Sequence, residues 1–355
     1  MIILSPKIFS DYYYNPNDIW AFFSSALITF CTLYFIKKGK LKYFYFLSLV
    51  FALAINTRLI FIYLYFLFIL IFFIKNKFSV DKELFKKIFL QLFLFLFFLY
   101  LITPQLWINF FGLFETFIKQ LSFPQDSMVY FWGEYQRSSE LPLFYIFIWM
   151  FISIPIIYIF LFFVGLFICI FELREKKLSP QNYDLIFVLL YLLIPLLAIL
   201  IMKPNLFNGW RHFYFLNLPI IYFSILGIQK IINFFNNKKI KNIFLFLLFL
   251  NLTNIAIWMI FNHPYQHVYF NYIGKKYNSN FDLDYWGLSN LNALKYIVNL
   301  ESNNSSKIKI KAVGDSRIIY AYKIMNNDLK EKISIMKRDN LTDADYYITN
   351  FHNGK

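Results

Sequence analysis

The side chains of this sequence that could do chemistry gather in short polar stretches between long apolar runs. The richest stretch, residues 262–287 (NHPYQHVYFNYIGKKYNSNFDLDYWG), contains His263, His267, Asp282 and Asp284. Every long apolar run comes before it, and the lengthy polar sequence comes after it. Aromatic rings and hydrogen-bonding groups at such a boundary predict a binding site at a membrane surface.

A second polar stretch, residues 208–212 (NGWRH), separates two apolar runs. Arg211 opens the second run, where a cation gains nothing from the positive end of a helix dipole. A guanidinium with His212 beside it fits a phosphate or pyrophosphate headgroup, since its planar donors match phosphate oxygens. The alternative is that Arg211 only extends to the phosphates of surrounding lipids.

The long loop before residue 142 contains the WGE motif of residues 132–134, followed by Arg137. We expect this loop to cover a lipid-linked substrate, with Arg137 on a phosphate and Glu134 on the acceptor or sugar side. The alternative is an interfacial belt of aromatic residues with charged neighbours.

Asp11 and Asp18 lie in the segment DYYYNPND, directly before the first apolar run. Asp18 either caps the first long helix or provides a carboxylate that binds a metal or acceptor, or acts as a base. His263 and His267 are four residues apart, but Pro264 argues against a regular helix that presents both to a metal. No metal ligands are therefore assigned, although a divalent cation stays possible.

Composition indicates a membrane protein. The chain of 355 residues is 59% hydrophobic and 15% charged, whereas soluble domains are nearer a quarter charged. The net charge of +15 comes from short basic clusters between apolar runs, as in cytoplasmic loops, which disfavours nucleic-acid binding. Cys31 and Cys169 both lie in apolar runs and define neither a disulfide framework nor a zinc site.

Placing every basic cluster on the inner side predicts a mainly α polytopic protein with about eight spans and both termini outside. The spans are expected at residues 19–36, 43–55, 59–74, 88–103, 143–171 (kinked or interrupted near Pro155), 185–202, 213–228 and 243–260. The second and third are short, reaching only ~20–24 Å against a core of ~30 Å. Arg58 lies between them and would need a polar or anionic partner.

The C-terminal sequence predicts a small α/β domain. A helix is expected after Ser289 as its N-cap and another over residues 317–325, with strands at 307–313, 333–336 and 346–349. The predicted organisation is a transmembrane domain over residues 1–261, an outer-face junction over 262–287, and an outer α/β domain over 288–355.

Taken together, four motifs resemble those of a known family. They are YNPND (residues 14–18), WGE with PLFY (132–134 and 142–145), NGWRHF (208–213), and HPYQHVYFN with DYWG (263–271 and 284–287). In this order they resemble the bacterial GT-C membrane glycosyltransferases related to protein O-mannosyltransferases and to the aminoarabinose transferases of lipid A. The resemblance extends to about Gly287. The sequences HPYQHVYFN and DYWG are its most specific parts.

The resemblance implies transfer of a sugar from a polyprenyl-phosphate donor to a lipid, glycan or protein acceptor at the periplasmic face of the bacterial inner membrane. It implies Arg211, His212 and Arg137 on the donor phosphate, and Asp18 as a secondary catalytic carboxylate. On the acceptor or sugar side it implies Glu134, His263, Tyr265, Asp284, Tyr285 and Trp286.

The chain also departs from that family. Members begin with further helices and an outer loop with an acidic pair, one of which is the presumed base, and they continue beyond residue 349. We therefore expect this chain to be a fragment, a split gene or a product of a mis-assigned start. The alternatives are a lipid-linked-sugar flippase or transporter, a polysaccharide polymerase or ligase, and a non-catalytic membrane subunit.

Overall fold

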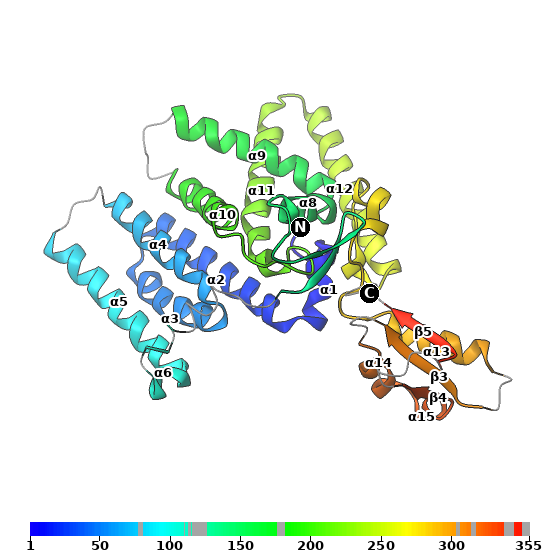
Figure 1. The fold of residues 1–355 in the computed structure, drawn as a ribbon. Coiled ribbons are helices and arrows are strands. Elements are labelled where there is room, and N and C mark those ends of the chain that lie inside the picture. Colours follow the sequence, from blue (N-terminus) through cyan, green and yellow to red (C-terminus); the bar gives the residue numbers. More distant parts are fainter. Residues whose placement is uncertain are drawn as a thin grey trace.

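The computed structural model describes residues 1–76, 81–109, 111–112, 115, 126–175, 182–302, 306–313, 317–336 and 344–349. It is mainly helical, and the helices form a body from which the strands β3 to β5 stand apart (Figure 1). The helices up to residue 280 are α1 (Pro6–Tyr14), α2 (Pro16–Lys38), α3 (Leu41–Thr57), η1 (Leu59–Phe61), α4 (Ile62–Lys75), α5 (Lys82–Ile102), α6 (Pro104–Ile108), α8 (Tyr145–Ser153), α9 (Ile156–Glu175), α10 (Tyr183–Met202), η3 (Arg211–Leu216), α11 (Asn217–Phe234), α12 (Lys238–Phe261), η4 (Gln266–Val268) and η5 (Gly274–Asn280).

Among the described residues, six helices are long and apolar enough to cross a membrane: α2, α5, α9, α10, η3 with α11, and α12. The apolar helices α3 and α4 are shorter, as predicted. Much of α12 faces outward with large apolar side chains such as Phe246 and Phe249, which requires apolar surroundings. These features indicate a helical membrane protein, whereas eight crossings remain a prediction.

Proline and asparagine set the helix boundaries near the predicted site. Pro16 occupies the first turn of α2, and the Asn15 side chain accepts a hydrogen bond from the backbone N–H of Asp18. Asn15 is therefore the N-cap, and the expectation that Asp18 caps this helix is wrong. The apolar run over residues 143–171 breaks at Pro155 into α8 and α9, as predicted.

Close approach of two backbones joins α9 to α11. A Cβ added at Gly165 would lie 1.8 Å from the carbonyl oxygen of Phe223, and one added at Gly227 would lie 2.4 Å from that of Leu161. Small residues allow such contacts between membrane helices, where lipid exclusion supplies little driving force. The pair Gly165 and Gly227 therefore fixes the spacing of these two helices.

Buried polar side chains connect α3, α4 and α5. Ser48 donates to the carbonyl oxygen of Gln91 at 3.0 Å, and the hydroxyl of Tyr65 donates to the Gln91 side chain at 2.8 Å. Because hydrocarbon offers no competing partners, such bonds fix the rotation of each helix.

The C-terminal residues form a second hydrophobic cluster around a parallel sheet of order β4-β3-β5 (Figure 1). Its elements are α13 (Asn290–Leu300), β3 (Ile308–Val313), α14 (Ile318–Ile324), α15 (Asn327–Lys330), β4 (Ile333–Ile335) and β5 (Tyr346–Thr349). We call α13 to β5 the C-terminal unit. The predicted strands are confirmed, while the boundaries 1–261, 262–287 and 288–355 remain a prediction.

Several local features differ from the sequence-based expectations. Helix α1 occupies the polar segment before the first apolar run, where no helix was predicted. A hairpin of β1 (Met128–Phe131) and β2 (Glu134–Arg137) lies in the long loop. Part of that loop, residues 116–125, lies outside the described residues. Ser289 stands before α13, but its hydroxyl donates to Asp284 and makes no capping bond.

Replacing Gly165 with Ala is expected to lower the thermal stability of the protein in detergent. The added methyl group would overlap the Phe223 carbonyl, and such overpacking costs about 1–3 kcal/mol or more. Phe167→Ala, at an outward-facing position of the same helix, is the control and should change the melting temperature little. Equal melting temperatures for Gly165→Ala and the wild type would contradict this packing.

Candidate functional site

Polar residues from distant parts of the chain meet at one end of the helical body. Helix α1 packs against η4, and the beginning of α2 packs against η3. These contacts bring the segment around Asp18 together with two of the predicted stretches, residues 208–212 and 262–287.

Asp18 is the centre of this site. Its carboxylate is buried and binds the guanidinium of Arg58 and the side-chain amide of Asn15. The Arg211 guanidinium lies 3.8 Å from its second oxygen. The prediction that Arg58 needs an anionic partner is confirmed. Asp18 therefore holds the two arginines and Asn15 together at the start of α2.

Arg211 is enclosed by aromatic rings. Its guanidinium carbon lies 4.9 Å from the ring centre of Phe207, 4.8 Å from that of Tyr285 and 5.4 Å from that of Trp286. Its buried Nε atom has no hydrogen-bond partner among the described residues. Aromatic faces hold the cation without consuming its N–H donors, so donors remain for an anion.

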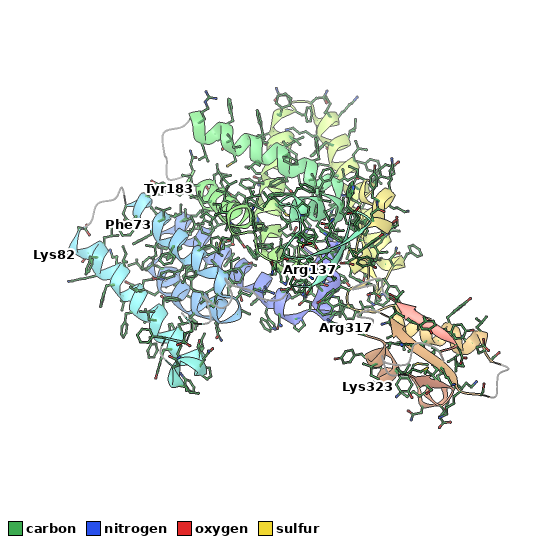
Figure 2. The ribbon with its side chains drawn as sticks, viewed as in Figure 1. Phe73, Lys82, Arg137, Tyr183, Arg317 and Lys323 are labelled. Atoms are coloured by element: carbon green, nitrogen blue, oxygen red, sulfur yellow. The ribbon has the colours of Figure 1, made fainter. Side chains whose placement is uncertain are left out.

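Arg317 of the C-terminal unit contacts the same two rings. Its guanidinium carbon lies 5.1 Å from the Tyr285 ring and 5.2 Å from the Trp286 ring. Figure 2 shows Arg317 where the C-terminal unit meets the helical body. Tyr285 and Trp286 therefore connect the two hydrophobic clusters as well as covering Arg211.

Helix α1 adds a cation and a carboxylate. The Lys7 ammonium lies 4.1 Å above the Trp149 ring, and Asp11 accepts a hydrogen bond from Asn15 at 3.2 Å. Burial lowers the pKa of Lys7 to about 8, although Asp11 and Asp282 oppose this shift. Burial also raises the pKa of Asp11 above its ordinary value, against the effects of Asn15 and Lys7. Asp11 therefore retains a proton more readily than an exposed aspartate.

A buried histidine–aspartate pair completes the site. The Nε2 atom of His267 lies 3.0 Å from Asp284, whose carboxylate also accepts bonds from the backbone N–H groups of Leu288 and Ser289 and from the Ser289 hydroxyl. Burial alone would raise the pKa of Asp284, but these bonds lower it to about 2. Asp284 is therefore ionised and holds the imidazole in one orientation.

The structure separates the predicted site residues into two groups. Asp18, Arg211, His212, Asp284, Tyr285 and Trp286 meet at the site, and Tyr265 borders it through a ring contact with His267. Arg137 and Glu134 lie exposed on the β1–β2 hairpin, where Arg137 pairs with Asp126 at 3.5 Å. His263 is exposed and contacts Gln266.

Sequence reasoning placed Asp11 and His267 on the outer face but assigned neither to the site, and it overlooked Lys7 and Asn15. A usable signal was present for Lys7, because Lys7 and Asp11 are four residues apart and so lie on one side of α1. Asn15 directly precedes Pro16, a pattern typical of a helix N-cap. Among the described residues, no group of three or more His, Cys, Asp or Glu side chains could hold a metal ion.

Comparisons with known proteins give no relative: no family model, no curated protein and no solved structure matches this chain. The resemblance to GT-C glycosyltransferases therefore remains a prediction.

Replacing Asp18 with Asn is expected to destabilise the protein by about 1.5–3 kcal/mol, because the partly buried guanidinium of Arg58 would lose a charged hydrogen-bond acceptor. The measurement is a double-mutant cycle with Arg58→Gln, followed by thermal unfolding. The double variant should lose much less stability than the sum of the single variants. Additive losses would show that the two side chains are not coupled.

Acidification is expected to remove the stabilisation supplied by Asp284. Since its folded-state pKa of about 2 lies below the ordinary 3.8, this stabilisation is present above about pH 4 and disappears as the pH falls toward 2. It amounts to on the order of 2 kcal/mol. Asp284→Asn should lower the free energy of unfolding at neutral pH and reduce its further decrease between about pH 4 and pH 2. Ser289→Ala removes only one hydroxyl donor to Asp284, so it should have a smaller effect on both quantities. An unchanged decrease in Asp284→Asn would contradict the assignment.

Proposed function

We propose that this chain takes part in the transfer of a sugar from a polyprenyl-phosphate donor to a lipid, glycan or protein acceptor at a membrane surface. The observation that carries the proposal is the Arg211 guanidinium. It is buried, enclosed by aromatic rings and unpartnered at Nε among the described residues, while the nearest carboxylate, Asp18, is already bound to Arg58.

The three parts of such a donor match three features of the site. The polyprenyl tail needs hydrocarbon, and η3 with α11 begins at Arg211 and is one of the six membrane-length helices. The phosphate needs a cation at the polar end of that helix, which Arg211 supplies. The sugar needs aromatic faces with hydrogen-bonding groups beside them, which Tyr285 and Trp286 supply together with Asp11.

Sugar transfer also produces charge that the site is built to accept. As the bond from the anomeric carbon to the phosphate breaks, negative charge grows on the phosphate, and a preorganised guanidinium in a dry site stabilises it. Asp18 then orients the two arginines and does not take part in proton transfer. His212 lies next to Arg211 and edge-on to Phe207, 4.9 Å between ring centres, where it would support the phosphate side.

The proposal includes a cellular arrangement. The chain would cross the bacterial inner membrane about eight times, with α3 and α4 as two short spans and the C-terminal unit in the periplasm. The supporting observation is that Lys37, Lys38 and Lys75 lie at the helix ends opposite to the ends that carry Asp18 and Arg58.

Arg211→Ala is expected to weaken binding of undecaprenyl phosphate to the purified protein by about 10- to 100-fold, since a charge-assisted hydrogen bond contributes about 1.5–3 kcal/mol. The measurement is titration in detergent with the phosphate lipid. Arg211→Lys should recover only part of the affinity, because an ammonium lacks the planar fork of donors.

The matched control for this titration is Arg137→Ala. Arg137 is an exposed arginine that already pairs with Asp126, and its removal should leave the affinity unchanged. Wild-type affinity in Arg211→Ala would remove Arg211 from the site and with it the main support for the proposed function.

A further inference from the structure

His267 has one ring nitrogen fixed and the other free. Its side chain is only 7% exposed, and Nε2 lies 3.0 Å from an Asp284 carboxylate that three further donors hold in place. Because that carboxylate accepts the Nε2–H bond, the neutral imidazole presents a lone pair at Nδ1. This Nδ1 atom is buried and has no hydrogen-bond partner among the described residues.

An unpartnered buried acceptor is costly. Leaving such an atom without a hydrogen bond costs about 1–3 kcal/mol, so native structures rarely retain one without a purpose. Asp284 cannot supply the missing hydrogen bond, because its carboxylate is an acceptor and already binds Nε2. A hydroxyl group placed at Nδ1 would supply the missing donor.

A small cavity lies beside this histidine. Its border includes His267, Lys7, Asp11, Tyr285 and Trp286. Its volume is about 10 Å³, near the lower limit for one water molecule and therefore the size of one hydroxyl group. The cavity shares Tyr285 and Trp286 with the aromatic enclosure of Arg211, so a hydroxyl at His267 would lie next to the phosphate site.

We propose that His267 is the general base that deprotonates the acceptor hydroxyl, with Asp284 as its positioning residue. This inference rests on the proposed sugar transfer. The acceptor oxygen forms its bond to the anomeric carbon while the bond from that carbon to the phosphate breaks, and the electron pair leaves with the phosphate. The hydroxyl proton moves to Nδ1, and Asp284 stabilises the imidazolium formed. The imidazolium then returns its proton to the departing phosphate or to solvent.

The carboxylates of the site fit this role less well. Asp18 is not among the residues that border the cavity, and its carboxylate is already bound by Arg58 and Asn15. Asp11 borders the same cavity, but its carboxylate already accepts a hydrogen bond from the side chain of Asn15. Arg211, which shares Tyr285 and Trp286 with the cavity, is a permanent cation and cannot accept a proton. Lys7 borders the cavity, but its ammonium lies over the Trp149 ring, and with a pKa of about 8 most of it is protonated at neutral pH.

The test uses the full-length protein in detergent and three variants: His267→Ala, Asp284→Asn and His263→Ala. His263→Ala is the matched control, because His263 is an exposed histidine four residues away in the same segment. Turnover is measured with a panel of polyprenyl-phosphate sugars and simple alcohol acceptors, and donor binding is measured with undecaprenyl phosphate.

We expect His267→Ala to lower kcat by about 100- to 10,000-fold with little change in donor affinity. Added imidazole should restore part of the rate, since it can occupy the space of the deleted ring. Asp284→Asn should also lower kcat but should not respond to imidazole, and His263→Ala should behave as the wild type.

Three results would overturn the inference. A wild-type kcat in His267→Ala would do so, most clearly if Asp11→Asn lost activity, since the base would then be Asp11. A parallel loss of donor binding and kcat without imidazole rescue would show a structural role. If the wild-type protein transfers no sugar from any donor, the proposed function itself is wrong. The first two results, in contrast, would leave sugar transfer in place and reject only the role of His267.

Discussion

The constraint on which the site depends is the burial of charge at the end of apolar helices. Asp18 and the Arg58 guanidinium bound to it come from α2 and from the turn between α3 and η1. A single buried ion costs several kcal/mol, and only well-placed partners offset that penalty. Asn15 completes the carboxylate's bonds, so the N-terminus of α2 and the turn at Arg58 cannot move apart without leaving a charge unpaired.

From this pair, further contacts extend to the rest of the site. Arg211 approaches the second oxygen of Asp18 and carries the aromatic enclosure, whose Tyr285 and Trp286 in turn contact Arg317 of the C-terminal unit. These contacts are mainly between cations and ring faces, which contribute about 0.5–2 kcal/mol each and tolerate small displacements. The ion pair is therefore the rigid part of the site, and the aromatic cover is the part that adapts.

The sequence revealed those features that depend on periodicity and on unpaired charge. Apolar runs located the long helices, alternation located β3, and an arginine between two apolar helices required the anion that Asp18 supplies. The sequence-based prediction assigned His263 and not His267 to the acceptor side, because which of the two is buried depends on how η4 packs against α1. The cap of α2 is Asn15 and not Asp18. Pro16 occupies the first turn, so the helix begins about one turn before the apolar run that starts at residue 19. Hairpin β1–β2 was missed because each strand has only four residues, and β1 (MVYF) is apolar throughout while β2 (EYQR) is mostly polar, so neither alternates.

The charges around Arg211 also favour an anionic ligand. Asp18 is bound to Arg58 and lies 3.8 Å from Arg211, so one carboxylate faces two guanidinium groups. Arg317 adds a second guanidinium on the same aromatic pair, Tyr285 and Trp286, so two cations lie close together there. Like charges that share a low-dielectric site repel each other more strongly than in water. A phosphate between or beside the two guanidinium groups would relieve that repulsion. The additional negative charge that the phosphate gains when its bond to the sugar breaks would be stabilised by the same two cations.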